Sequence, residues 1–269
     1  MRALFAVVCL GLAAAPRPTP AAEAGLPVDA ELVLAVDVSR SMTPRELEIQ
    51  RRGYAEALAS EEVIATIEAG YHGRVAIAYM EWAGSDSQRL VVDWTLVANR
   101  ADAEALAAKL TAHFDSSMRR TSISGALDRA ATLFDGNGFT AHRQVIDVSG
   151  DGPNNNGRPV LHARDQALAR GVAINGLPLM TDEGMGAQWH LPDLDRYYFH
   201  CVIGGPGAFV VPVHSWDEFP DAVRRKLILE LSWTPPAAPE PTIQPATAVE
   251  ADDCLIVEHI WERMWGDMN

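Results

Sequence analysis

The chain has 269 residues, a formal net charge of −14 and 48% hydrophobic residues, which is enough apolar material for one large domain or two small ones. The acidic charge and the lack of any block of Lys and Arg in the sequence argue against nucleic acid as a partner, because phosphates are bound by clustered positive side chains. A cationic or metal-bridged partner suits this charge better.

The first 24 residues have the pattern of a secretory signal peptide. One Arg precedes an apolar run over residues 3–15, and Ala22 and Ala24 frame a small-x-small site, so we expect cleavage after Ala24. The run is too short to span a bilayer comfortably, and no later stretch of the sequence is long and apolar enough to do so. We therefore expect a periplasmic or secreted protein without stable membrane insertion after cleavage.

An apolar run at residues 32–36 ends in the carboxylate of Asp37 and the hydroxyls of Ser39 and Ser41. Such a run is typical of a strand that is covered on both faces in a parallel sheet. Open α/β sheets bind ligands at the carboxyl ends of their strands. Three hard oxygen donors at every second position therefore predict a site for Mg²⁺, Mn²⁺ or Ca²⁺ rather than for zinc.

Strands and helices alternate along the chain up to residue 231. Thr43, Pro44 and Glu46 are start signals for a helix over 44–69. Further strands are expected at 75–80, 89–94, 144–149, 172–179 and 208–213, and further helices at 100–111, 121–134, 160–170, 193–201 and 216–231. The short connection before 89–94 fits a hairpin, which makes that strand antiparallel and an edge. The pattern predicts an α/β fold with a doubly wound, mostly parallel sheet and one antiparallel edge strand.

Four segments follow from this pattern: a signal peptide at 1–24, an α/β domain at 25–233, a Pro/Ala-rich linker at 234–250 and a C-terminal amphipathic helix at 251–269. Removal of the signal peptide leaves Cys201 and Cys254. An oxidising compartment favours one disulfide between them, and two unpaired buried thiols are the alternative. The C-terminal helix either docks on a partner or packs back on its own domain.

Two later oxygen donors are expected at the same edge of the sheet: Thr121 at a helix start and Asp151 after the strand at 144–149. Alone, Thr121 fits a helix N-cap and Asp151 fits a turn. Taken in order with Asp37, Ser39 and Ser41, they resemble the metal-ion-dependent adhesion site of von Willebrand factor A domains, whose pattern is Asp-x-Ser-x-Ser, then Thr, then Asp. The resemblance covers about residues 29–232 and implies a Rossmann-like fold.

The segments 148–155 and 202–209 look more narrowly like a family of exported bacterial A-like domains of unknown function. The resemblance to A domains implies that Ser39 and Ser41 hold a divalent cation through their hydroxyls. It implies that Thr121 joins directly or through water, and that Asp37 and Asp151 bind through water or directly. The cation is expected to be Mg²⁺, with Mn²⁺ or Ca²⁺ as alternatives, and an Asp or Glu of a protein partner would complete its octahedron.

The first functional hypothesis is thus an exported binding module that captures an acidic group of a partner, and not an enzyme. The sequence has no His-Glu-x-x-His motif and no Gly-x-Ser-x-Gly elbow. A metal-dependent hydrolase that uses the same cation is the alternative, with Asp147 or Glu183 as its base. A third hypothesis is a structural domain that binds through its C-terminal helix. The asparagines at 154–156 predict a flexible polar loop, with ligand contact as the alternative.

Overall fold

The computed structural model describes residues 25–112, 118–181, 191–232, 254–256 and 259. The expected signal peptide, the expected linker and most of the expected C-terminal helix lie outside these residues. In the described part of the chain, no helix is long and apolar enough to cross a membrane.

A five-stranded sheet forms the centre of the molecule, in the order β4-β3-β2-β6-β7. Its four parallel strands are β2 (Glu31–Asp37), β3 (Val75–Trp82), β6 (Gln144–Gly150) and β7 (Val172–Pro178). The edge strand β4 (Gln88–Val97) runs antiparallel to β3. Two short strands, β1 (Leu26–Pro27) and β5 (Phe139–Thr140), pair separately. The predicted fold class is confirmed, including the antiparallel edge.

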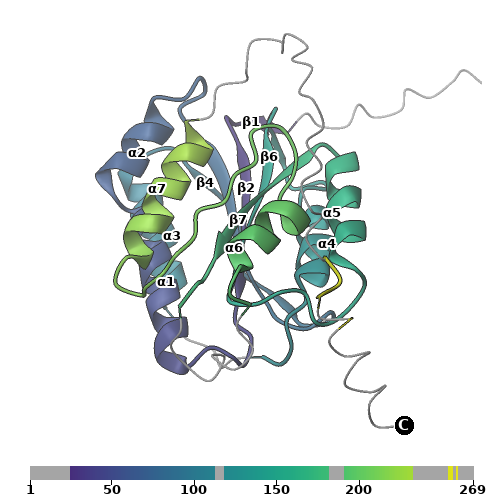
Figure 1. Ribbon diagram of the computed structural model, residues 1–269. Coiled ribbons are helices and arrows are strands. Elements are labelled where there is room, and N and C mark those ends of the chain that lie inside the picture. Colours follow the sequence, from purple (N-terminus) through teal and green to yellow (C-terminus); the bar gives the residue numbers. More distant parts are fainter. Residues whose placement is uncertain (1–24, 113–117, 182–190, 233–253, 257–258, 260–269) are drawn as a thin grey trace, which may run out of the picture.

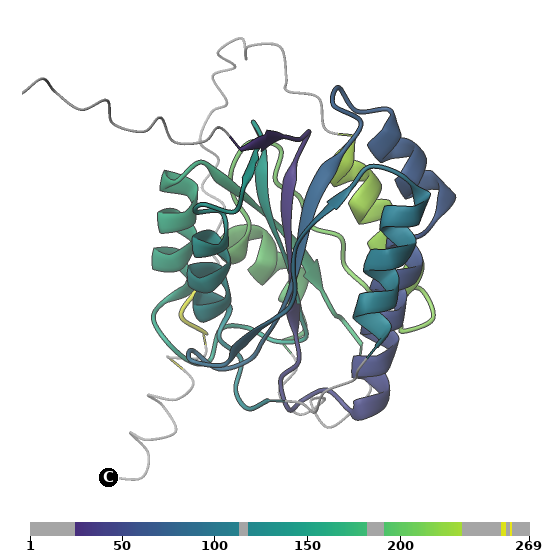
Figure 2. The same cartoon turned by 180° about the vertical axis from the view of Figure 1, so that it is seen from behind.

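Helices cover both faces of the sheet (Figures 1 and 2). One face carries α1 (Pro44–Leu58), α2 (Glu61–Glu68), α3 (Arg100–Thr111) and α7 (Phe219–Leu231). The other face carries α4 (Ile123–Leu133), α5 (Val160–Ala169), α6 (Leu194–Tyr197) and the π-helix η2 (Tyr198–Val202). Because successive side chains of a strand point to opposite faces, Leu32 and Leu34 of β2 enter the first core and Val33 and Ala35 the second. This double burial explains why β2 is a continuous apolar run.

The predicted helix over 44–69 starts where expected but is interrupted. Thr43 and Glu46 form a reciprocal capping box, in which the Thr43 N–H donates to Glu46 Oε2 at 2.6 Å. The helix then ends, and Ser60 caps a second helix by accepting the N–H of Val63 at 3.4 Å. A serine that caps its own helix thus divides the predicted helix into α1 and α2.

The prediction of a strand over 208–213 is wrong. This segment meets β7 through isolated parallel bridges, Gly176 with Val210 and Leu179 with Val213. Between the hydrogen bonds that Gly176 N–H donates to Phe209 and Met180 N–H donates to Val213, Pro178 lacks the N–H that would continue the ladder. The segment therefore lies beside the sheet without extending it.

Cys201 and Cys254 form a disulfide, with their Cα atoms 5.5 Å apart. Of the two alternatives left open by the sequence, the paired state is the one observed. Cys254 and Ile256 pack against the core on the side of α4, α5 and η2. The bond therefore ties residues beyond the predicted linker to the π-helix.

Candidate metal centre

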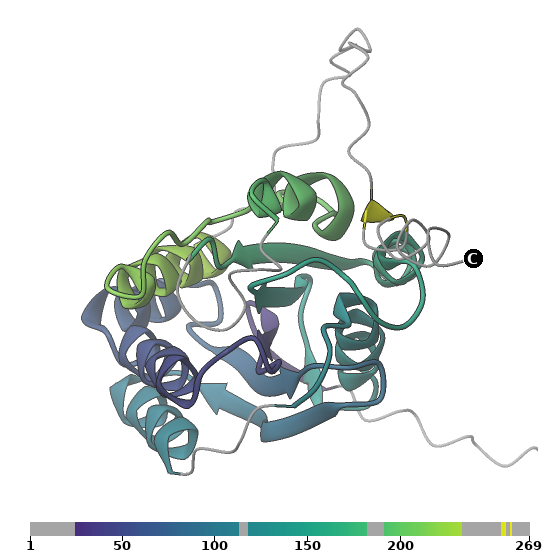
Figure 3. The same cartoon turned by 60° about the horizontal axis from the view of Figure 1, so that its bottom comes forward.

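Asp37 and Asp151 lie on loops that follow neighbouring strands at one edge of the sheet, the edge brought forward in Figure 3, whereas the loop of Thr121 follows α3. Asp37 is the last residue of β2 and pairs in register with Trp82, the last residue of β3. On the other side of β2, β6 ends at Gly150, directly before Asp151. Parallel strands deliver their carboxyl ends to the same edge, so the loops of Asp37 and Asp151 meet there.

The first loop brings its three donors together. Asp37 is fully buried, and its Oδ1 accepts the backbone N–H of Ser39 at 2.6 Å. The hydroxyls of Ser39 and Ser41 lie 2.8 Å apart. From α1, Gln50 Nε2 donates to the carbonyl of Asp37 at 3.0 Å and fixes the end of the strand. The every-second-residue spacing therefore does gather a carboxylate and two hydroxyls at one point.

The second carboxylate oxygen of Asp37 is unsatisfied. Among the described residues, Oδ2 has no hydrogen-bond partner although it is buried. Burial, followed by the charge of Asp151, raises the pKa of Asp37 well above its ordinary value, against the weaker lowering effect of hydrogen bonds from Ser39 and Asp151. Two acids, Asp37 and Asp151, are thus close enough in this site to affect each other's ionisation.

Another buried acid of the sheet shows how this fold neutralises a carboxylate with its own residues. Glu81, on β3, is 2% exposed and contacts both Arg51 and Arg89. In the described part of the chain, Asp37 has no such Arg or Lys contact. The electrostatic surroundings of Asp37 therefore differ from those of Glu81, because the charge that acts on it is that of the second acid Asp151.

Thr121 reaches the site on a loop fixed by backbone contacts. Met118 donates its N–H to the carbonyl of Val38 at 2.8 Å, which lays this loop against the Asp37 loop. Thr121 itself is 6% exposed. The N-cap of α4 is Ser122, whose hydroxyl accepts the N–H of Gly125 at 3.1 Å. The simpler interpretation of Thr121 as the cap is therefore wrong, and its hydroxyl is not used in capping.

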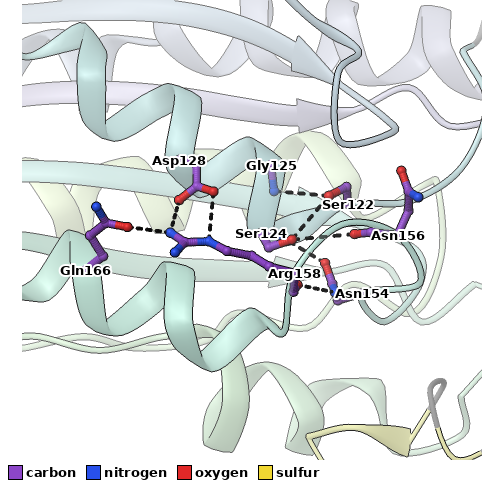
Figure 4. A network of polar contacts seen from close by, with 8 residues as sticks. All are labelled: Ser122, Ser124, Gly125, Asp128, Asn154, Asn156, Arg158 and Gln166. Atoms are coloured by element: carbon purple, nitrogen blue, oxygen red, sulfur yellow. Dashed lines mark hydrogen bonds and ion pairs between the residues drawn. The ribbon is translucent and has the colours of Figure 1, made fainter.

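Three consecutive asparagines join the loop after β6 to neighbouring loops. Each side-chain oxygen accepts a backbone N–H: Asn154 from Ser124 at 3.0 Å, Asn155 from Thr121 at 2.9 Å, and Asn156 from Ser85 at 2.8 Å. Figure 4 shows Asn154 and Asn156 beside the start of α4. These amides act as links that hold the loops of Thr121 and Asp151 in place, a role that the sequence did not indicate.

Beyond these links, Arg158 anchors the end of the same loop to α4 and α5 (Figure 4). Its guanidinium binds Asp128 in a two-pronged contact and also donates to Gln166 Oε1 at 2.6 Å. A polar groove of about 430 Å³ opens beside this pair and includes Ser85 and Gln88. The groove lies along the start of α4, and none of the five predicted donors lines it.

Of the two residues proposed as a catalytic base, only Asp147 is among the described residues, and it lies in the core. Asp147 is in the middle of β6, 1% exposed, and its Oδ1 lies 2.6 Å from Lys226 Nζ of α7. Burial and the charge of Glu230 raise the pKa of Asp147 to about 7, against the lowering effect of Lys226. Asp147 is thus part of a core ion pair, and Glu183 lies outside the described residues.

Among the residues that the structure describes, no three His, Cys, Asp or Glu side chains gather as metal ligands usually do. The predicted centre has two carboxylates, and its other donors are hydroxyls. Hydroxyl and carboxylate oxygens are ligands of hard cations, so the donor set fits Mg²⁺, Mn²⁺ or Ca²⁺.

A family model described as "Protein of unknown function (DUF1194)" matches residues 27–235. No curated protein matches the sequence.

Solved structures share the fold at low identity. They include the pilus adhesin SpaC from Lactobacillus rhamnosus GG in its open conformation, with 13% identity, a TM-score of 0.54, and coverage of 76% of this chain and 30% of that one. A second is proximal thread matrix protein 1 from the mussel byssus, whose metal-ion-dependent adhesion site (MIDAS motif) is occupied by zinc. Its identity is 14% and its TM-score 0.53, with coverage of 77% of this chain and 49% of that one. A third is a von Willebrand factor type A protein from Catenulispora acidiphila, with 14% identity, a TM-score of 0.50, and coverage of 75% of this chain and 42% of that one. The chain thus spans less than half of each neighbour, and the likeness shows the von Willebrand A fold.

Proposed function

Because this chain belongs to the DUF1194 family, which is described only as being of unknown function, we propose a function from its own residues. We propose that it is an exported binding module that captures an Asp or Glu side chain of a protein partner through a divalent cation, Mg²⁺ before Mn²⁺ or Ca²⁺. The residues that would hold the cation are those of the three loops: Asp37, Ser39, Ser41, Thr121 and Asp151.

The observation that carries the proposal is the half-satisfied carboxylate of Asp37. A buried carboxylate that faces a second acid is costly unless a positive charge accompanies it. Glu81 receives that charge from two arginines, whereas Asp37 faces Asp151 and two serine hydroxyls. An external cation at this point would balance both acids.

The donor set also favours capture over simple storage of a cation. When bound, the cation supplies a positive charge that hydroxyl ligands do not neutralise, and this charge attracts a further carboxylate. Ser39 and Ser41 contribute hydroxyls from one loop, and Thr121 offers a third from another.

The structural neighbours support this proposal only through the fold that they share with this chain. An adhesin and a byssus protein are among them, and the latter has zinc in its MIDAS motif. That kind of motif is the one that Asp37, Ser39 and Ser41 resemble. The periplasmic or secreted location belongs to the same proposal.

We also propose that the chain is not an enzyme. A hydrolase would need a base close to the cation. Asp147 is occupied by Lys226 in the core between β6 and α7. Its engagement there favours binding over hydrolysis.

The proposal is tested by cation-dependent stability. A ligand present at 100 times its Kd stabilises a protein by about 2.7 kcal/mol, which is roughly 5–10 °C in Tm for a domain of this size. We expect Mg²⁺ or Mn²⁺ to give such a shift relative to chelator. Asp37→Ala should abolish the shift, and the exposed Asp165→Ala on α5 should retain it. An unchanged Tm of the wild-type protein in saturating cation would contradict the proposal.

Partner capture and catalysis are tested on the same samples. A pull-down with the wild-type protein should recover a partner in Mg²⁺ and lose it in chelator, and substitution of one acidic residue of that partner should abolish recovery. Phosphoesters and esters incubated with the protein and Mn²⁺ should remain intact. Turnover that Asp37→Ala removes would favour the hydrolase.

A further inference from the structure

A buried tyrosine reaches the candidate centre from an element outside the adhesion-site pattern. Tyr198 is the first residue of η2 and is fully buried. Its ring passes over Gly176 of β7, where a Cβ atom would come within 2.8 Å of Tyr198 Cδ1. Only a glycine leaves room for the ring at that position.

The hydroxyl of Tyr198 ends beside the carboxylate of Asp37. The position that a Cβ would take on Gly150 is 2.9 Å from Tyr198 Oη and 3.0 Å from Asp37 Oδ2. The two oxygens are therefore no further apart than the sum of these distances. One water molecule can bridge two polar atoms over such a separation, and a closer approach would allow a direct hydrogen bond.

These two atoms are chemically complementary and both lack a partner. Within the described ranges, neither Tyr198 Oη nor Asp37 Oδ2 has a hydrogen-bond partner, and both are buried. A buried polar atom without a partner is costly, so its retention needs a reason. A phenol O–H is a hydrogen-bond donor and a carboxylate oxygen is an acceptor, so the two atoms can satisfy each other.

We propose that Tyr198 is a positioning residue of this centre, and that its hydroxyl donates to Asp37 Oδ2, directly or through one water, when a cation is bound. The inference rests on the proposed function. The Ser39 N–H already holds Oδ1, so a donor on Oδ2 fixes the plane of the carboxylate. An oxygen that is engaged by a phenol neutralises the cation less, which leaves more charge for the partner's carboxylate.

The element that presents Tyr198 is fixed at several points. The preceding residue, Tyr197, accepts the N–H of Asn154 through its Oη at 3.2 Å, which ties this turn to the loop after Asp151. Cys201, in the same π-helix, is bonded to Cys254. A π-helix is a rare element that often occurs at functional sites. Here it directs the phenol beneath the cation-binding loops.

The test compares Tyr198→Phe with a matched control, Tyr79→Phe. Tyr79 is also fully buried with a hydroxyl that has no partner among the described residues, but it packs in the core on the α1 side. Titration calorimetry of the full exported protein with Mn²⁺ should give a Kd about tenfold weaker for Tyr198→Phe, as expected for loss of a hydrogen bond to a charged group. The Kd of Tyr79→Phe should equal that of the wild-type protein.

Two further readouts separate positioning from a structural role. In chelator, Tyr198→Phe should melt at or above the wild-type temperature, because it removes a buried hydroxyl that has no partner. Addition of Mg²⁺, which does not absorb, should perturb the tyrosine absorption of the wild-type protein and of Tyr79→Phe but not of Tyr198→Phe.

Each outcome bears on the inference. Equal Mn²⁺ affinities of the wild-type protein and Tyr198→Phe would overturn the role of Tyr198 and leave the proposed function standing. The inference would also be overturned if Tyr198→Phe melted below the wild-type protein in chelator and still showed the same Mg²⁺-induced change in tyrosine absorption as the wild-type protein. If the wild-type protein binds neither Mn²⁺ nor Mg²⁺, the proposed function and this inference both fail.

Discussion

Asp37→Asn should stabilise the cation-free protein. The amide keeps an oxygen that can accept the Ser39 N–H, but it removes the charge that is buried beside Asp151. The amide nitrogen replaces Oδ2, so the gain comes from removing the buried charge beside Asp151, and we expect about 1–3 kcal/mol, which is roughly 2–10 °C in Tm for a domain of this size. Active and binding sites often carry such a cost in stability.

The gain from Asp37→Asn should depend on pH with a defined sign. Because the pKa of Asp37 is raised in the folded state, the wild-type protein binds a proton more readily when folded. The stability that this provides is complete below the unfolded-state pKa, near 4, and is lost as pH rises through the folded-state pKa. The advantage of the variant should therefore grow with pH.

Urea and thermal unfolding in chelator at pH 5 and pH 7.5, repeated in saturating Mg²⁺, measure these effects. We expect the variant to be the more stable protein in chelator and the less stable one in Mg²⁺, since only the wild-type protein gains from the cation. The exposed Asp165→Asn should match the wild-type protein throughout. A variant that is less stable in chelator at both pH values would refute the reasoning.

Three other outcomes are expected. Because the pKa of Asp147 is raised to about 7 in the folded protein, the wild-type protein should lose up to about 4 kcal/mol of unfolding free energy as the pH rises from 4 to 7. Asp147→Asn should flatten this pH dependence in urea titrations. An unchanged slope of unfolding free energy against pH in the variant would contradict the prediction. Reduction of the bond between Cys201 and Cys254, which are 53 residues apart, should cost up to about 4 kcal/mol, and equal melting with and without reductant would contradict this. Asn154→Ala leaves the Ser124 N–H without its acceptor and should cost about 1–3 kcal/mol by urea unfolding, and equal stability of the variant and the wild-type protein would contradict this.

The fold was predictable because its main signals are local. Apolar runs such as 75–80 are strands that are buried on both faces, and the capping box at Thr43 fixes the start of α1. The error at 208–213 arose because β-branched residues there favour a strand, while the proline that interrupts its ladder, Pro178, lies on a different segment. Pairing between distant segments is not a local property.

The part of the candidate site that depends on local sequence was predictable, and the part that depends on the packing of distant elements was not. The Asp37, Ser39 and Ser41 set is encoded by spacing within one loop, so its convergence follows from the local sequence. The approach of Tyr198 depends on how η2 crosses β7, which no short motif specifies. One signal was available: Gly150 and Gly176 end or interrupt buried strands, and glycine in a strand often marks a close approach of another group.

The two ends of β2 give an internal comparison for the candidate centre. Glu31 at the amino end is 1% exposed, and each of its carboxylate oxygens accepts a hydrogen bond, Oε1 from the Ala141 N–H at 2.9 Å and Oε2 from Asn137 at 2.6 Å. Asp37 at the carboxyl end is equally buried, yet one of its oxygens has no partner in the described part of the chain. The same strand therefore satisfies an acid at one end and leaves another incomplete at the end where open α/β sheets bind ligands. Under the proposed function, a cation bound at the carboxyl end of β2 accounts for this difference between two equally buried acids.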